Sequence, residues 1–419
     1  MATDRILSRA IAPKVVEALE DTRIVVLQGA RQVGKSTLAE QIARTRTSMV
    51  VTLDDVAVRG FASTDPVGFV AQHPEGMLVI DEIQRVPELI LALKAAVDRD
   101  KRPGRFLVTG SANLLDLATT HESLAGRAEH LTLQSFSQSE LAGEHANFVD
   151  GAFEGQALGR FVSVLDRADY LTRACDGGYP EALARTSVSR REDWYREYIA
   201  LIVNRDAADV SGLQRLADLP RLLRLIAARS GSGMVWSALA NESGIPRTTL
   251  DPYVRLLETL YLTVTLPSWT VNLTSRETKQ PKVFLADTGL AASLLGVSPQ
   301  ALAPTVPQSP AGALLESFVV GELSRQLGWS RVHASMYHYR EHRGAEVDVV
   351  LEAPDGRVVG IEVKAAATVQ RKDLAGLTIL RDKLGDRFVR GYVLFTGREA
   401  QMVGERMTAL PIEAMWRGE

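Results

Sequence analysis

Residues 29–37 read Gly29-Ala30-Arg31-Gln32-Val33-Gly34-Lys35-Ser36-Thr37, which contains a complete G-x-x-x-x-G-K-[ST] motif. An apolar run at residues 24–27 precedes the motif, and a helix-like run at residues 36–43 follows it. This context predicts a phosphate-binding loop between a buried strand and a helix, in which the glycines let the backbone approach an anion. Lys35 is expected to reach the β and γ phosphates and Ser36 to bind Mg²⁺, so residues 29–37 predict a site for ATP and Mg²⁺.

The whole chain has 419 residues, of which 46% are hydrophobic and 24% are charged, with a formal net charge of -3. This composition is typical of a soluble globular protein, and it has no basic or acidic excess that would indicate nucleic acid or a membrane surface. At about 150 residues per domain, the length predicts several domains. The single cysteine, Cys175, excludes an intramolecular disulfide and a cysteine-based zinc cluster. Because we also see no signal peptide and no membrane-spanning run, we expect a cytoplasmic protein without a membrane partner.

Two carboxylates, Asp81 and Glu82, follow the apolar run at residues 76–80. In a P-loop fold the ligand lies beyond the carboxyl ends of the parallel strands, close to residues of this kind. Asp81 would then help to hold Mg²⁺, and Glu82 would polarise the water that attacks the γ phosphate. The alternative is a strand that ends in solvated acids, but the phosphate loop upstream favours a site that hydrolyses ATP as well as binding it.

Three further residues complete the predicted hydrolysis site. Thr109 and Ser111 end a strand-like run at residues 105–111, where a hydroxyl group could contact the γ phosphate or the attacking water. Arg127 precedes another strand-like run at residues 130–133, and an arginine there could stabilise charge at the nucleotide of a neighbouring subunit. That role requires a homo-oligomer, and the alternative is an ordinary surface arginine.

Three stretches in this part of the chain carry a family resemblance: Gly-Ala-Arg-Gln-Val-Gly-Lys-Ser-Thr, Leu-Val-Ile-Asp-Glu-Ile-Gln-Arg-Val-Pro-Glu-Leu and Leu-Val-Thr-Gly-Ser-Ala. Together they resemble the motifs of prokaryotic AAA-superfamily ATPases that carry a C-terminal domain of unknown function. Similar stretches at residues 177–183, 282–290 and 344–348 extend the resemblance over nearly the whole chain. In the first of these, Tyr179 and Pro180 look like the element with which related ATPases contact the base, although the residues alone predict only a turn.

The middle of the chain predicts a helical lid and then a winged helix-turn-helix. Aromatic and aliphatic residues recur at helical spacing between residues 190 and 210, which suits a lid helix. Three helix-like runs and a strand-like run follow, with Gly244 ending one helix and Pro246 beginning the next.

In a winged helix, the residues that begin the last helix contact DNA, and here these are Arg247, Thr248 and Thr249. The charge balance of this region argues against DNA, because residues 187–279 hold twelve Lys or Arg and ten Asp or Glu. A winged helix that contacts protein is therefore the alternative.

The C-terminal region contains Asp348, Glu362 and Lys364 in the D…E-x-K pattern of the PD-(D/E)xK nuclease fold. Glu362 and Lys364 share one face of a predicted strand, and Glu316 on a helix-like run could add a ligand. Carboxylates bind a hard divalent cation, the metal activates a water and the lysine orients it. These residues predict a second metal site on a nuclease-like fold, and the alternative is a remnant salt-bridge cluster.

We therefore predict an α/β protein with four domains. They are a P-loop AAA-type parallel-sheet core at residues 1–145, a helical lid at 146–212, a winged-helix-like domain at 213–280 and an α/β restriction-endonuclease-like domain at 281–419. We favour an ATP-hydrolysing protein that uses its nucleotide state to move a winged-helix and nuclease-like tail, with DNA as a candidate partner. A regulatory switch whose tail binds a protein partner and an ATP-regulated endonuclease are the alternatives.

Overall fold

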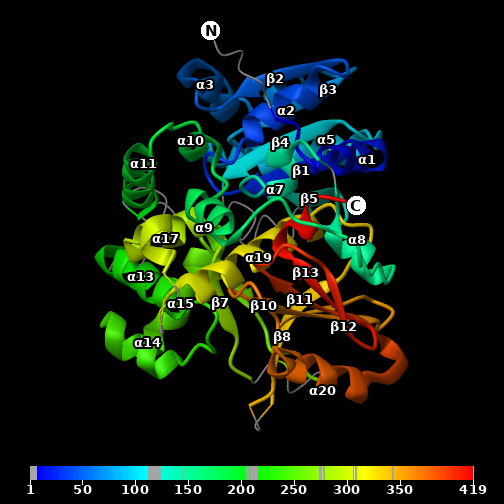
Figure 1. The fold of residues 1–419 in the computed structure, drawn as a ribbon. Coiled ribbons are helices and arrows are strands. Elements are labelled where there is room, and N and C mark those ends of the chain that lie inside the picture. The colour runs from blue at the N-terminus through cyan, green and yellow to red at the C-terminus, as the bar shows by residue number, and fades with distance from the viewer. Residues whose placement is uncertain are drawn as a thin grey trace. The chain divides into compact units, whose positions relative to one another are not determined.

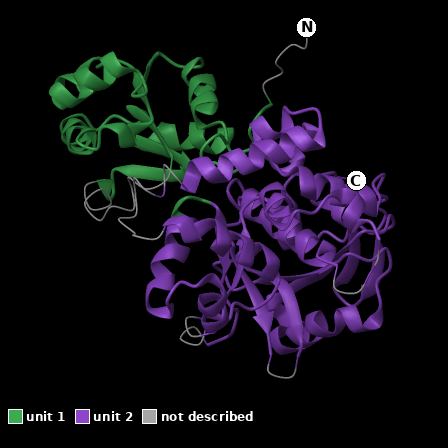
Figure 2. Ribbon diagram, turned by 90° about the vertical axis from the view of Figure 1, so that its left-hand side faces the viewer, with its two compact units in different colours: residues 1–136, 259–261 green, residues 137–258, 262–419 purple. Residues whose placement is uncertain are grey.

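The computed structural model describes residues 7–111, 124–144, 146–203, 207, 216–272, 276, 279–304, 306, 309–341 and 344–418. The chain forms two compact units, of which the first holds residues 1–136 with 259–261 and the second holds residues 137–258 with 262–419 (Figure 2). Within the described ranges, no helix is both long enough and apolar enough to cross a membrane.

The first unit is built on a five-stranded parallel sheet with the strand order β2-β3-β4-β1-β5 (Figure 1). The strands are β1 (Ile24–Gly29), β2 (Ser48–Thr52), β3 (Met77–Asp81), β4 (Phe106–Ser111) and β5 (Ala128–Thr132). The three central strands are buried apolar runs, as expected for parallel strands that are covered on both faces. The strands predicted for this region and the parallel-sheet core are therefore confirmed.

Amphipathic helices cover this sheet with their apolar faces. They are α1 (Ala12–Asp21), α2 (Lys35–Ala43), α3 (Val56–Thr64), α4 (Pro66–Ala71) and α5 (Leu89–Arg99), with a 3-10 turn η1 (Ile83–Arg85) after β3. Phe69 of α4 and Leu93 of α5 share one buried core with Ile80 and Phe106 of the sheet. Because the strands are parallel, the residues that follow β1, β3 and β4 emerge at the same edge of the sheet.

The second unit begins with helices that include the predicted lid. They are α7 (Gln138–Ala142), α8 (Phe148–Phe153), α9 (Arg167–Asp176), α10 (Pro180–Leu183) and α11 (Val188–Leu201). The helical spacing predicted for this region is confirmed in α11, where Trp194, Tyr195 and Tyr198 are buried. The continuation of the predicted lid helix over residues 204–206 and 208–210 lies outside the described residues.

Three helices and a two-stranded antiparallel sheet follow in the second unit. They are α13 (Leu219–Arg229), α14 (Trp236–Ser243), α15 (Arg247–Thr259), β6 (Thr263–Leu266) and β7 (Lys282–Leu285), after a 3-10 turn η3 (Leu216–Asp218). Gly244 ends α14 in the left-handed conformation, with a φ of 78°, which glycine adopts without a steric cost. The predicted order of helices and strand is present, whereas the winged helix itself stays a prediction.

A six-stranded mixed sheet forms the C-terminal part of the second unit, in the order β12-β13-β11-β10-β9-β8 (Figure 1). Its strands are β8 (Ser335–Arg340), β9 (Glu346–Glu352), β10 (Val358–Lys364), β11 (Phe388–Phe395), β12 (Gln401–Gly404) and β13 (Met407–Pro411). The helices around it are α17 (Thr288–Leu295), α18 (Pro299–Leu302), α19 (Ala311–Leu327) and α20 (Ala375–Leu384), with 3-10 turns η4 (Arg371–Leu374), η5 (Gly385–Arg387) and η6 (Ile412–Met415). β8, β9 and β10 pair antiparallel, while β10, β11 and β13 pair parallel.

Helices lie on both faces of this mixed sheet. Gly360 of β10 faces Leu377 of α20 so closely that an added Cβ would lie 2.7 Å from the leucine side chain, and a Cβ at its strand partner Gly391 would lie 3.4 Å from the same leucine. Tyr392 follows Gly391 and therefore points to the opposite face, where its ring packs at 5.0 Å against Phe148 of α8. The sheet thus forms the middle layer of an α/β arrangement.

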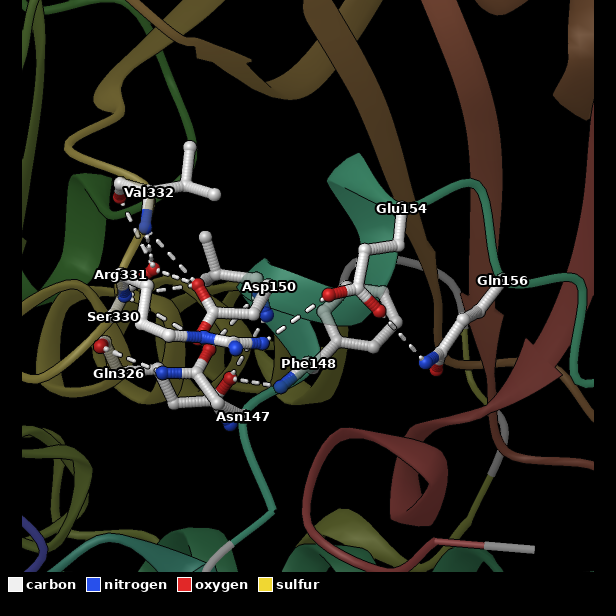
Figure 3. Close-up of polar contacts among 10 residues, drawn as sticks. Asn147, Phe148, Asp150, Glu154, Gln156, Gln326, Ser330, Arg331 and Val332 are labelled. Atoms are coloured by element: carbon white, nitrogen blue, oxygen red, sulfur yellow. Dashed lines mark hydrogen bonds and ion pairs between the residues drawn. The ribbon is translucent and has the colours of Figure 1, made fainter.

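Hydrogen bonds to the Asp150 carboxylate connect α8 to the turn that follows α19. Its carboxylate accepts hydrogen bonds from the Ser330 hydroxyl at 2.5 Å and from the backbone N–H groups of Arg331 at 3.0 Å and Val332 at 3.1 Å (Figure 3). Burial opposes the charge of Asp150, but these hydrogen bonds hold its pKa below the ordinary value. A helix of the predicted lid is therefore attached to the C-terminal region, within one compact unit.

Candidate functional site

The phosphate loop connects β1 to α2 in the first unit. Gly29 and Gly34 have φ values of 148° and 96°, which L side chains rarely adopt. A Cβ at Gly29 would also lie 2.0 Å from the carbonyl oxygen of Leu133. Gly34 is followed at once by α2, so the N–H groups of the first helical turn adjoin the loop. The two glycines therefore determine the shape of an anion-binding loop at the carboxyl end of β1.

Lys35 lies inside this loop. Its side chain is buried, and Nζ donates hydrogen bonds to the carbonyl oxygens of Gly29 at 3.0 Å and Ala30 at 2.8 Å. The ammonium group is thus held where the terminal phosphates of a nucleotide would bind. Of the other predicted loop residues, Ala30 and Val33 are buried, Arg31 and Ser36 are half-buried, and Gln32 and Thr37 are exposed.

The Asp81 carboxylate accepts hydrogen bonds from the phosphate loop and from two neighbouring strands. Its Oδ1 accepts hydrogen bonds from the Ser36 hydroxyl at 2.7 Å and the Thr109 hydroxyl at 2.5 Å. Its Oδ2 accepts a weaker bond from the Thr52 hydroxyl at 3.3 Å. A carboxylate and a hydroxyl beside a phosphate loop are the oxygen ligands that Mg²⁺ prefers, so Ser36 and Asp81 fit the predicted ion.

Glu82 is held by its backbone and by its side chain. Its φ of 59° places it in the left-handed region, which is uncommon for a residue other than glycine, and residues with such backbone strain cluster at functional sites. Its backbone N–H donates to the Thr109 hydroxyl at 3.2 Å. Gln84 donates through Nε2 to the Glu82 carboxylate and, at 2.7 Å, to the Ser111 hydroxyl. The structure therefore brings the predicted residues Glu82, Thr109 and Ser111 together around one glutamine that the sequence did not single out.

A second residue missed from the sequence is Arg9, which is buried behind the phosphate loop. Its guanidinium donates to the carbonyl oxygens of Val33 and Gln134, both at 2.7 Å, and its Cζ lies 4.5 Å from the centre of the Phe136 ring. Arg9 thereby joins the loop to the segment after β5. The residue precedes every recognised motif, so no signal in the sequence points to it.

Arg127 lies at the opposite end of the sheet from the phosphate loop. Its backbone carbonyl accepts the N–H of Ile24, the first residue of β1, at 3.3 Å. Its guanidinium makes two hydrogen bonds with the Asp98 carboxylate, at 2.6 Å and 3.0 Å. Arg127 therefore does not join the cluster around Asp81 within the first unit, and its predicted role at a neighbouring nucleotide stays a prediction.

Tyr179 and Pro180 belong to the second unit. The Tyr179 ring is buried in an aromatic cluster in which its centre lies 4.9 Å from that of Tyr198, and its hydroxyl accepts a hydrogen bond from the Tyr198 hydroxyl at 3.2 Å. The backbone N–H of Gly178 donates to Asp287 Oδ2 at 2.8 Å. Two of the recognised stretches thus meet through Gly178 and Asp287, while the contact of Tyr179 and Pro180 with the base stays a prediction.

The predicted DNA-contacting residues begin α15 and are exposed. Arg247, Thr248 and Thr249 all lie on the surface of the second unit. Arg247 forms an ion pair of 2.7 Å with Asp251, one turn along the helix, and the Thr249 hydroxyl donates to the carbonyl oxygen of Pro246 at 3.1 Å. Their exposure is compatible with a contact to a partner, and DNA as that partner stays a prediction.

The predicted carboxylate cluster of the C-terminal region is also brought together. Asp348 Oδ2 accepts the Val363 N–H at 2.9 Å, and Glu362 forms an ion pair of 2.6 Å with Lys364. Burial raises the pKa of Glu362 to about 8, and the neighbouring Asp348 charge adds to the shift. Burial likewise raises the pKa of Glu316 to about 8, again with a contribution from Asp348.

Lys282 of β7 is the residue of this cluster that the sequence did not indicate. Its side chain is 0% exposed, and Nζ lies 2.9 Å from Glu316, 2.7 Å from Glu346 and 3.5 Å from Asp348. Burial opposes its charge, but the three carboxylates raise the pKa of Lys282 above its ordinary value. In the described part of the chain, no three Asp, Glu, His or Cys side chains are arranged so that they could hold a metal ion.

Comparison with known families agrees with the geometry of the first unit. Residues 21–142 match the family described as "AAA domain". We call this part of the chain the AAA domain, after the family that it matches. The AAA domain contains the phosphate loop, Asp81 and Glu82, so the protein is an ATPase of the AAA type. Residues 167–301 and 311–415 match two families described as domains of unknown function, DUF8612 and DUF4143.

Two curated relatives resemble the chain over almost all of its length. They are the uncharacterized proteins Rv2008c of Mycobacterium tuberculosis and Mb2031c of Mycobacterium bovis. Each is 26% identical over 407 residues, which cover 97% of this chain and 83% of the relative. The similarity therefore spans the AAA domain and the second unit together.

Solved structures resemble the chain only distantly. The Walker-type ATPase of Pyrococcus abyssi has a TM-score of 0.39 and 17% sequence identity, covering 69% of this chain and 96% of that one. A DNA replication initiation factor has a TM-score of 0.25 and 13% identity, covering 59% of this chain and 74% of that one. At these TM-scores the likeness carries no argument about function.

Proposed function

We propose that the AAA domain binds ATP with Mg²⁺ and cleaves the γ phosphate, and that its nucleotide state controls the binding of a partner by the second unit. The observation that supports hydrolysis best is the hydrogen-bonded group of Ser36, Asp81 and Thr109, which lies beside Glu82 at the carboxyl edge of the sheet. A site built only to hold a nucleotide would not need a hydrogen-bonded array that orients two consecutive carboxylates.

Each residue of this array has a separate task. Lys35 would leave its two carbonyl partners to bind the β and γ phosphates, and the N–H groups at the start of α2 would bind phosphate oxygens. Ser36 and Asp81 would hold Mg²⁺, which offsets phosphate charge when it is bound. Glu82 would accept a proton from the attacking water, while Thr109 and Ser111 keep the carboxylates in place.

A nucleotide-binding measurement tests the first part of this proposal. Lys35→Ala removes the charge from the loop, and Lys101→Ala, which removes an exposed lysine of the same unit between α5 and β4, serves as the matched control. Titration with a fluorescent ATP analogue and Mg²⁺ should show binding to the control and a large loss of affinity in Lys35→Ala. Equal affinity in the two proteins would contradict the assignment of the loop.

We also propose that the ATPase works as a homo-oligomer in which Arg127 reaches the nucleotide of a neighbour. Its position at the amino end of the sheet supports action on another subunit rather than on its own. Light scattering of Glu82→Gln protein with ATP should reveal an oligomer. Arg127→Ala should then lower turnover without lowering nucleotide affinity, and a monomer with undiminished turnover would contradict this role.

DNA is the first candidate for the partner, on the strength of the exposed start of α15. Arg247, Thr248 and Thr249 present a cation and two hydroxyl groups at a helix N-terminus, which suits phosphate contacts. Affinity for duplex DNA should fall with salt, and Arg247→Ala should weaken binding and make the salt slope shallower. Salt-independent or absent binding would leave a protein partner as the candidate.

A further inference from the structure

Lys282 is the one described lysine whose side chain is fully buried among several carboxylates. It lies on β7, yet its ammonium group contacts Glu316 of α19 and both Glu346 and Asp348 of β9. An ammonium group has three N–H donors, and here three carboxylates are available to accept them. Burial of an unpaired lysine would be costly, so these ion pairs are what allows Lys282 to lie there.

The oxygens that a divalent cation would need are already bound to nitrogen. Asp348 Oδ1 lies 3.5 Å from Lys282 Nζ, and Asp348 Oδ2 accepts the Val363 N–H at 2.9 Å. Glu362 bonds to Lys364 at 2.6 Å through Oε1, while its Oε2 accepts the Asp348 N–H at 3.4 Å. Each of these two carboxylates therefore uses both oxygens to accept N–H groups of the protein.

We propose that Lys282 is a built-in cation that takes the place of a divalent metal among Glu316, Glu346 and Asp348, so that the C-terminal sheet does not work as a metal-dependent nuclease. Through its ion pairs the lysine also connects β7 to α19 and β9, so the carboxylates have a structural role. This inference concerns the second unit and does not depend on ATP hydrolysis. It replaces the sequence-based expectation of a metal at Glu316, Asp348 and Glu362.

One consequence is that removing the lysine should uncover a metal site. Lys282→Ala leaves the buried Asp348 and the half-buried Glu316 and Glu346 without their cation, and carboxylate oxygens suit Mn²⁺ or Mg²⁺. Deleting a single partner of a buried ion pair leaves the other charge uncompensated, so the variant should also melt at a lower temperature than the wild type. Added Mn²⁺ should restore part of that loss, because a ligand that binds only the folded state stabilises it.

The test titrates the full chain with Mn²⁺ in the absence of nucleotide. Electron paramagnetic resonance measures the concentration of free Mn²⁺ at each step. All proteins would carry Asp81→Asn, so that the AAA domain does not contribute a Mn²⁺ site. Any Mn²⁺ binding by the protein with Lys282 should be weak and should not depend on Asp348. Lys282→Ala should bind one ion per chain at least tenfold more tightly than the protein with Lys282. Adding Asp348→Ala to that variant should abolish the gain.

Two further variants keep the test decisive. Lys383→Ala removes a lysine of the same unit that pairs with the half-buried carboxylate of Glu341, and it should gain no Mn²⁺. Lys282→Val suits a strand and is short enough to leave the position of Nζ empty, and it should fold if Lys282→Ala does not. Asp348-dependent Mn²⁺ binding by the protein with Lys282 would overturn the proposal, as would a folded Lys282→Ala or Lys282→Val protein that binds no Mn²⁺.

Discussion

Thr109 donates a hydrogen bond of 2.5 Å to Oδ1 of Asp81, and its hydroxyl oxygen accepts the backbone N–H of Glu82 at 3.2 Å. One side chain of β4 therefore positions both acidic residues at the carboxyl end of β3. The two strands are neighbours in the sheet, so the relationship is a direct result of the strand order. It links the residue expected to hold Mg²⁺ with the residue expected to activate water.

Replacing this hydroxyl should slow hydrolysis more than it weakens binding. Thr109→Val keeps the shape of the side chain but leaves Asp81 and Glu82 without a shared partner, and a small misplacement of catalytic groups costs roughly tenfold to a hundredfold in rate. Steady-state turnover and ATP affinity would be measured together. Thr109→Ser restores a hydroxyl and should recover most of the rate, whereas equal rates in Thr109→Val and wild type would refute this role.

Arg9 should increase the affinity for ATP, because it holds the phosphate loop in place from behind. Arg9→Ala removes two hydrogen bonds of 2.7 Å, one of them to Val33 within the loop, and hydrogen bonds to charged groups are worth about 1.5 to 3 kcal/mol. We expect the dissociation constant for ATP to rise about tenfold. Arg9→Lys should not restore it, because one ammonium group cannot reproduce the two-pronged guanidinium contact.

A matched control for Arg9 is available in the same unit. Arg46→Ala removes an arginine whose guanidinium bonds to the Val16 carbonyl oxygen at 3.3 Å, away from the loop. Its ATP affinity should equal that of the wild type. If the two variants lost affinity to the same extent, the effect of Arg9 would be general destabilisation rather than support of the loop.

Asp287 should be essential for the stability of the second unit. Its buried carboxylate accepts the N–H of Gly178 at 2.8 Å and caps α17 by accepting the N–H groups of Gly289 at 3.0 Å and Leu290 at 3.2 Å. Asp287→Ala leaves these donors buried without a partner, which should cost roughly 3 kcal/mol or more of unfolding free energy. Differential scanning calorimetry would measure the loss.

The control for Asp287 is another helix cap. Asp166 caps α9 with hydrogen bonds to Ala168 at 2.9 Å and Asp169 at 3.2 Å, but it is exposed, so Asp166→Ala should cost only about 1 kcal/mol. Similar losses in both variants would show that Asp287 acts as a cap alone. The hydrogen bond from the Gly178 N–H to Asp287 would then contribute nothing to the free energy of unfolding.

His338 should make the second unit less stable in acid. Burial lowers its pKa to about 4, and the charge of Lys282 acts in the same direction. Between pH 6.5 and pH 4 the unfolded chain therefore binds a proton at His338 that the folded chain does not, so the contribution of His338 to stability falls as the pH falls, by up to about 3 kcal/mol, while the raised pKa values of Glu316 and Glu362 act in the opposite direction. The stability of His338→Gln relative to the wild type should therefore rise as the pH falls in urea titrations, and parallel profiles would contradict the shift.

The sequence predicted the first unit well because its signals are local. The loop from Gly29 to Ser36 and the pair Asp81 and Glu82 each follow an apolar run that can only be a buried strand in this context. Once the strands are parallel, these residues must emerge at one edge, and their proximity in the structure follows. The hydroxyl groups of Thr109 and Ser111 were found by the same reasoning.

The residues that the sequence missed act over long separations. Arg9 bonds to Gln134, and Lys282 bonds to Glu346 and Asp348, so each contact depends on how distant segments fold together. Lys282 lies in a short apolar run that predicts only a strand, and nothing nearby indicates that its charge is buried. The sequence pattern of Asp348, Glu362 and Lys364 was therefore visible, while the cation between the carboxylates was not.

The measurement that tests the central claim most directly is the ATP turnover of Glu82→Gln beside that of the wild type, with ATP affinity determined for both. Glutamine keeps the size of the side chain but cannot accept a proton from water, and the loss of a general base slows a reaction by roughly a hundredfold or more. We predict unchanged affinity and a turnover reduced to this extent. Equal turnover in the two proteins would contradict the account of this protein as an ATPase that uses Glu82 to activate water.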